Sequence, residues 1–142
     1  MATATASRSF EVPAETVREA ILTDVPAFIR ASGFDSLTVE GDTYTVSRDI
    51  GLATFELTLE RLESEHLLEF EQIEGMFDRM WTEYRLEGDE SGCELVATTE
   101  FTLGGVLAPI LDGTMIETQR HGEFDNQFDY VSSAIESSAD GM

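Results

Sequence analysis

The strongest candidate for chemistry in this 142-residue chain is a pair of ionisable side chains four positions apart, Glu117 and His121. Residues at positions i and i+4 are neighbours on one face of a helix, so such a pair can share or transfer a proton. The two residues could act as general acid and base, or they could orient the polar end of a ligand. The same spacing also produces an ordinary glutamate–histidine contact at the edge of a core, and the sequence leaves these alternatives open.

Two arginines, Arg8 and Arg48, fall in phase with the inward positions of predicted strands. A buried guanidinium needs a carboxylate partner or an anionic ligand. One of the two could therefore meet a ligand carboxylate, or Glu117 across a cavity. If they lie at strand ends instead, or if a bulge shifts their phase, they reach solvent.

The sequence contains no stronger catalytic signature. His66 is the only other histidine and no H-E-x-x-H motif is present, so we predict no metal site. Because Cys93 is the only cysteine, an intrachain disulfide is excluded, and the chain fits a reducing, cytoplasmic setting. We find no glycine-rich phosphate loop and no Ser–His–Asp or Cys–His arrangement, and we expect no cofactor.

Charge limits the possible partners. The chain has 29 Asp and Glu against 8 Lys and Arg, a formal net charge of −21, and every basic residue is arginine. Such a surface repels phosphate backbones and has no basic stripe, which argues against nucleic-acid binding. The acids are spread along the chain rather than arranged as a calcium loop. The sequence shows no apolar leader and no apolar run near 18 residues, so we expect neither secretion nor membrane insertion.

The excess of acid and the lack of lysine together predict adaptation to a salt-rich cytoplasm. Repulsion among the acids weakens as the Debye length falls from about 10 Å at 0.1 M salt to about 3 Å at 1 M. We therefore expect the melting temperature to rise steeply between about 0.1 M and about 2 M KCl. Thermal unfolding followed by circular dichroism across this series tests the prediction, and a constant melting temperature would contradict it.

The elements that position these residues follow from the periodicity of apolar residues. Residues 3–12 alternate and predict a strand, and Pro13 and Asp24 suit the starts of two short helices. From residue 35 to about residue 103, apolar residues recur at every second position between short acidic or glycine-containing turns, such as Gly41-Asp42. This pattern predicts an antiparallel meander with one apolar and one acidic face.

A helical period then predicts one long helix from about residue 106 to residue 136, followed by a frayed tail at 137–142. Ile116 is predicted to lie off its apolar stripe. Between Val106 and Phe124, that stripe also contains glycine and polar residues: Gly113, Glu117, Arg120 and His121. A polar gap in an otherwise apolar face is what a ligand cavity requires.

The order of elements predicts an α+β fold in a single domain, residues 1–142, in which a strongly bent antiparallel sheet of six to seven strands wraps round the C-terminal helix. This order resembles the START-like, or helix-grip (SRPBCC), superfamily, in particular its polyketide-cyclase-like members. The resemblance rests on a strand followed by V-P-A-E-x-V, and on Y-x-L-E-x-D…G-C-x-L followed by F-x-L-G-G. It implies a cavity between sheet and helix that holds a hydrophobic small molecule, without naming a ligand.

The predicted ligand-binding residues are those that the two periodicities turn inward. They are Tyr44, Arg48, Phe55, Phe70, Met80, Tyr84, Glu117, His121 and Phe124. Tyr44 and Tyr84 could line the cavity or pack in the core, where each hydroxyl would need a partner.

Three functions remain open. The first is a carrier or sensor of an apolar small molecule such as a lipid, isoprenoid or polyketide, as a monomer or weak homodimer. The second is a cyclase, aromatase or isomerase in which Glu117 and His121 are acid and base, and Tyr84 or Arg48 steadies an enolate. The third is an accessory subunit that docks a partner protein through an outer face containing Trp81.

Overall fold

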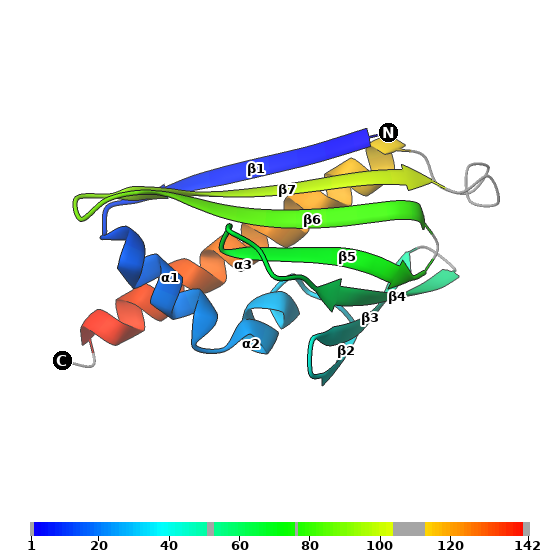
Figure 1. Ribbon diagram of the computed structural model, residues 1–142, viewed down its shortest axis with the longest axis horizontal. Coiled ribbons are helices and arrows are strands. Elements are labelled where there is room, and N and C mark those ends of the chain that lie inside the picture. Colours follow the sequence, from blue (N-terminus) through cyan, green and yellow to red (C-terminus); the bar gives the residue numbers. More distant parts are fainter. Residues whose placement is uncertain (1, 51–52, 76, 104–112, 141–142) are drawn as a thin grey trace.

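A computed structural model describes residues 2–50, 53–75, 77–103 and 113–140 (Figure 1). The elements in chain order are β1 (Ala2–Phe10), α1 (Ala14–Leu22), α2 (Val25–Arg30), β2 (Ser36–Glu40), β3 (Thr43–Ile50), β4 (Ala53–Arg61), β5 (Leu68–Glu74), β6 (Phe77–Gly88), β7 (Cys93–Leu103) and α3 (Gly113–Asp140). The strands form one antiparallel seven-stranded sheet in the order β1-β7-β6-β5-β4-β3-β2. The α+β architecture predicted from the sequence is confirmed, including the two short helices after the first strand.

Local signals in the sequence explain the N-terminal helices. Pro13 precedes α1 in an extended conformation, and Val17 and Ile21 turn one apolar stripe of α1 into the core. The Asp24 carboxylate accepts a hydrogen bond from the Ala27 N–H at 3.0 Å and so caps α2, as predicted. Gly33 follows with a φ of 100°, a left-handed conformation that suits glycine and redirects the chain toward β2.

The sheet is a meander whose register keeps apolar side chains on one face. The predicted hairpin at Gly41-Asp42 joins β2 to β3, with Glu40 paired to Thr43. On the inner face, Tyr84 of β6 lies opposite Ala97 of β7. Register shifts in the β4–β5 and β6–β7 pairings mark bulges, which bend and twist a sheet. On β6, the half-buried Trp81 donates its indole N–H to Glu69 Oε2 at 2.9 Å.

Helix α3 runs along the sheet, and α1 and α2 lie beside its C-terminal half (Figure 1). It buries Phe124, Phe128 and Val131 completely in the main core. Ile116 is 4% exposed and packs with Phe77, Met80 and Phe101, so the prediction that it lies off the stripe was wrong. The buried face of α3 also contains polar residues. A stripe drawn through the apolar residues alone therefore misplaces the centre of this face.

The two ends of the predicted long helix compare differently with the structure. The predicted start at residue 106, with Val106 and Ile110, lies outside the described residues. At the other end, α3 extends to Asp140, within the segment 137–142 that the sequence suggests is frayed. None of the helices in the described ranges is both long enough and apolar enough to cross a membrane.

Candidate functional site

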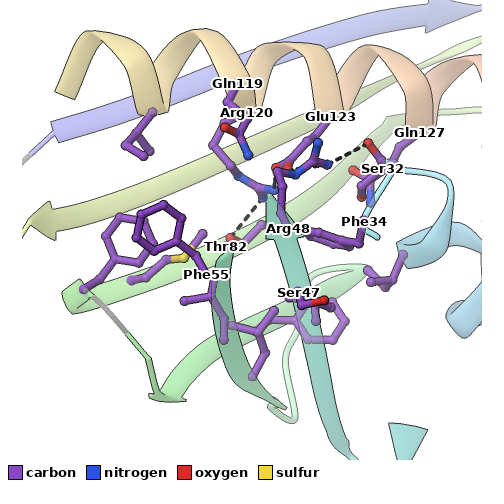
Figure 2. Close-up of a pocket in the computed structure, with 18 of the residues that line it drawn as sticks. Ser32, Phe34, Ser47, Arg48, Phe55, Thr82, Gln119, Arg120, Glu123 and Gln127 are labelled. Atoms are coloured by element: carbon purple, nitrogen blue, oxygen red, sulfur yellow. Dashed lines mark hydrogen bonds and ion pairs between the residues drawn. The ribbon is translucent and has the colours of Figure 1, made fainter. Parts of the chain in front are cut away.

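A cavity lies between α3 and the inner face of strands β3 to β6 (Figure 2). Its volume is about 60 Å³, measured as the space open to the centre of a water molecule. One water needs roughly 10–15 Å³ by this measure, so the cavity has room for several waters or for a compact organic group. Most of its walls are apolar: Ile29, Phe34, Val46, Phe55, Leu57, Leu59, Phe70, Phe77, Met80, Tyr84 and Ile116.

One wall of the cavity carries a buried charge cluster of Arg48, Arg120 and Glu123. Arg120 and Glu123 are three residues apart on α3, and they form an ion pair between Arg120 Nη1 and Glu123 Oε1. Arg48 reaches the same carboxylate from β3, with its Nη2 2.8 Å from Glu123 Oε2 (Figure 2). The Glu123 side chain is only 4% exposed, so it is a shared counter-ion between two guanidinium groups in a poorly solvated place.

Arg120 is held on every side. Its Nε and Nη2 donate to Thr99 Oγ1 at 3.1 Å and 2.9 Å, and Nη2 also donates to Thr82 Oγ1 at 3.3 Å. Its guanidinium carbon lies 4.4 Å from the centre of the Phe124 ring, a cation–π contact. Burial alone would lower the pKa of Arg120, but Glu123 and Tyr84 together raise it above its usual value, so the group stays charged.

Arg48 is held more loosely. Its Nη2 donates to the Ser32 carbonyl oxygen at 3.3 Å, and its guanidinium carbon lies 5.2 Å from the centre of the Phe34 ring. Its Nε is buried and has no hydrogen-bond partner. The side chain as a whole is 23% exposed, compared with 9% for Arg120.

A chain of neutral hydrogen bonds runs beside the charge cluster. The Tyr84 hydroxyl donates to Gln127 Oε1 at 2.8 Å, and Gln127 Nε2 donates to the Phe28 carbonyl oxygen at 3.3 Å. Burial raises the pKa of the Tyr84 hydroxyl, outweighing the opposing effects of Arg120 and Gln127. Tyr84 is therefore a neutral hydrogen-bond donor at physiological pH.

This raised pKa predicts how Tyr84 titrates. Its phenolate absorbance should appear only above pH 10, the approximate value for an exposed tyrosine. Because the folded state holds this proton more tightly, the associated stability is fully present below about pH 10 and is lost as pH rises through the folded-state pKa. The measurement is the difference between the near-ultraviolet pH titrations of wild type and Tyr84→Phe. A Tyr84 step at or below pH 10 in the folded protein would contradict the placement.

The structure brings together part of the predicted ligand-binding set. Lining the cavity are Arg48, Phe55, Phe70, Met80 and Tyr84. Tyr44 and Phe124 are buried beside the cavity, in the core. Tyr44 packs edge-on against Phe70, and Phe124 packs edge-on against Tyr84. Glu117 is half-buried and His121 exposed, and neither is among the residues that line the cavity.

The carboxylate that meets Arg48 is Glu123, and the expectation that Glu117 could play this part is corrected. The two glutamates are six residues apart, which rotates them by about 240° round a helix, so they cannot share a face. Arg8, the other inward-phase arginine, pairs with Asp129 at 2.8 Å; both side chains are partly exposed. Of the two alternatives predicted for Arg8, the structure therefore shows the one in which the side chain reaches solvent.

The sequence reasoning missed Glu123 and Gln127. The sequence does indicate both residues, because they are adjacent to Phe124 and Phe128 on the stripe and continue the helical spacing from Arg120. Polar residues that share the helical spacing of a buried apolar stripe indicate a polar cluster between the helix and the sheet. In the described part of the chain, no group of three His, Cys, Asp or Glu side chains has an arrangement suited to a metal ion.

Solved structures with the same arrangement of elements include three informative examples. A protein of Thermus thermophilus superposes with a TM-score of 0.74 at 16% identity, over 96% of this chain and 99% of that one. A START superfamily protein from Mycobacterium smegmatis gives a TM-score of 0.70 at 9% identity, over 95% and 97%. The ZhuI aromatase/cyclase of Streptomyces sp. R1128 gives a TM-score of 0.63 at 18% identity, over 98% of this chain and 93% of that one.

The chain has the START-like, helix-grip fold. No protein-family model matches its sequence, and no curated protein matches it either. At these low identities the likeness establishes how the chain is folded, and the site itself must carry any conclusion about function.

Proposed function

We propose that this protein binds a hydrophobic small molecule in the cavity between the sheet and α3, as a carrier or sensor. The observation that carries the proposal is the cavity itself, a largely apolar space with a few polar groups on one wall. Proteins of the same fold include a START superfamily protein and an aromatase/cyclase, which is consistent with a fold that accommodates apolar guests. The net charge of −21 supports a salt-rich cytoplasm as its setting.

The volume of the cavity narrows the choice of guest. A space of about 60 Å³ for water centres suits a compact guest of one or two rings, such as part of an aromatic polyketide or a short isoprenoid. A long-chain lipid would require α3 or the side chains on the facing strands to move. Among the ligand classes considered from the sequence, compact ring compounds are therefore favoured over lipids.

The positions of Glu117 and His121 favour a carrier or sensor over an enzyme that uses them as acid and base. A catalytic acid or base must come within hydrogen-bond reach of the reacting atoms, directly or through one water. His121 is exposed on α3, and the cavity is lined by other residues of that helix. A guest in the cavity would meet Arg120, Glu123 and Gln127 instead.

Native mass spectrometry of protein purified at high salt from its natural source tests the proposal. We expect a co-purifying apolar molecule on the wild type, and its loss from Leu57→Trp, in which a bulky ring fills the cavity. Leu22→Trp is the matched control, because Leu22 is exposed on α1 and outside the cavity lining. An equal adduct on all three proteins, or bare protein in every sample, would contradict the proposal.

A further inference from the structure

We infer that the guest carries one negative charge, of the carboxylate class, and that Arg48 receives it. This inference rests on the proposed function, because it concerns a ligand in the same cavity.

The charges on the residues that line the cavity do not balance. Among the described residues that line it, the charged ones are Arg48, Arg120 and Glu123, and the other polar ones are neutral: Ser32, Ser47, Thr82, Gln119 and Gln127. Two guanidinium groups against one carboxylate leave an excess of one positive charge. A protein with a net charge of −21 thus places a net cation in its apolar interior. A monoanion would neutralise this excess, whereas a cation would increase it.

Arg120 is already bound to neighbouring protein groups through all three of its nitrogens. They donate to Thr99, Thr82 and Glu123, and Phe124 covers one face of the guanidinium group. Such a group fixes the position of the shared carboxylate without turning toward a guest. We therefore assign Arg120 as a positioning residue, which holds Glu123 in place between the two arginines.

Arg48 has a buried donor that no protein group uses. Its Nε is buried without a hydrogen-bond partner, a state that protein interiors rarely tolerate. A carboxylate that enters the cavity would supply the missing acceptor, because one edge of a guanidinium group binds a carboxylate through two parallel hydrogen bonds. Since the Nε is covered in this conformation, the Arg48 side chain must turn to expose it. Its side chain is 23% exposed, compared with 9% for Arg120, which gives it room to turn about its contacts with Glu123 and Phe34.

A pair of matched probes tests the inference. The acid is 2-naphthoate and its neutral counterpart is 2-naphthalenemethanol, which share a flat apolar body and differ in the charge of one group. Binding to wild type, Arg48→Met and Arg8→Met is measured by isothermal titration calorimetry in about 2 M KCl, where the field of the acidic surface is largely screened. Arg8→Met is the control, because Arg8 also lies on a strand but pairs with Asp129 outside the cavity lining.

We expect wild type and Arg8→Met to bind the acid at least about tenfold more tightly than the alcohol, and Arg48→Met to lose this preference. Equal affinity for the two probes in wild type, or a preference that survives Arg48→Met, would overturn the inference while leaving the proposed function intact. If neither probe binds wild type, the inference fails, and the native mass spectrometry described above decides separately whether the proposed function fails with it.

A second readout needs no substitution in the cavity. In wild type labelled with ¹⁵N, the Arg48 Nε–H signal should shift on addition of 2-naphthoate much more than on addition of the alcohol, because only the acid supplies a charged acceptor. The Arg8 Nε–H signal should stay in place in both titrations. An unmoved Arg48 signal at saturating acid would overturn the assignment of Arg48, whether or not Arg48→Met folds.

Discussion

Glu123→Gln should lower the free energy of unfolding by about 3 kcal/mol or more, because it removes the negative charge that lies between two guanidinium groups. Arg120 cannot escape to solvent, since its side chain is only 9% exposed. A buried charge that has lost its partner retains its full desolvation cost. Urea denaturation at constant high KCl measures the change.

Two further variants show whether burial is the cause. Asp129→Asn breaks the ion pair with Arg8, in which the Asp129 side chain is 71% exposed, and should cost at most about 1 kcal/mol. The double variant Arg120→Met, Glu123→Gln should be more stable than Glu123→Gln alone, because it removes the unpaired buried charge as well. If Glu123→Gln costs no more than Asp129→Asn, the buried cluster does not exist as described.

Phe124→Ala is expected to lower the free energy of unfolding by about 3–5 kcal/mol, the usual cost of removing a buried aromatic ring from a core. The ring is fully buried, packs edge-on against Tyr84 with centroids 6.0 Å apart, and lies against the Arg120 guanidinium. Its loss would leave a void next to the charge cluster and release Arg120 on one side. Chemical denaturation of the variant gives the value directly.

Phe124→Leu is the matched control, because leucine keeps most of the apolar volume but has no ring face for Arg120. We expect Phe124→Leu to lower the free energy of unfolding by about 1.5 kcal/mol, less than Phe124→Ala does. This pair also separates two roles for Phe124, which the sequence predicts as a ligand contact. A small loss of stability in Phe124→Ala, with a large loss of affinity for 2-naphthoate, would show that Phe124 contacts the guest and that its core role is minor.

The fold could be predicted because its signals are local. The Asp24 cap, the turn at Gly41 and the period-two runs of β3 to β7 each depend on neighbours a few residues away. Together with the long helical period near the C-terminus, they leave few ways to cover one apolar sheet face. The order of the elements and the polar gap in the stripe of the long helix predict a bent sheet with a cavity beneath it, and the resemblance to the helix-grip superfamily implies the same cavity.

The site was harder to predict because its contacts join distant parts of the chain. Alternation placed Arg48 and Tyr84 on the inner face, but it could not show that their partners are Glu123 and Gln127. That choice depends on the rotation of α3 about its own axis, which is set by packing against the sheet. A search for titratable neighbours on the helix favours Glu117 and His121, because a sequence motif does not reveal which flank is buried.

Nuclear Overhauser contacts between the guest and protein methyl groups test most directly the claim that a compact apolar guest occupies the space between the sheet and α3. With ¹³C-methyl-labelled protein and saturating 2-naphthoate, we predict contacts from the naphthalene ring to methyl groups of Leu57, Leu59 and Ile116, which line the cavity. Contacts confined to the exposed side chains of Leu22 and Ile73, or no contacts at saturation, would contradict the claim.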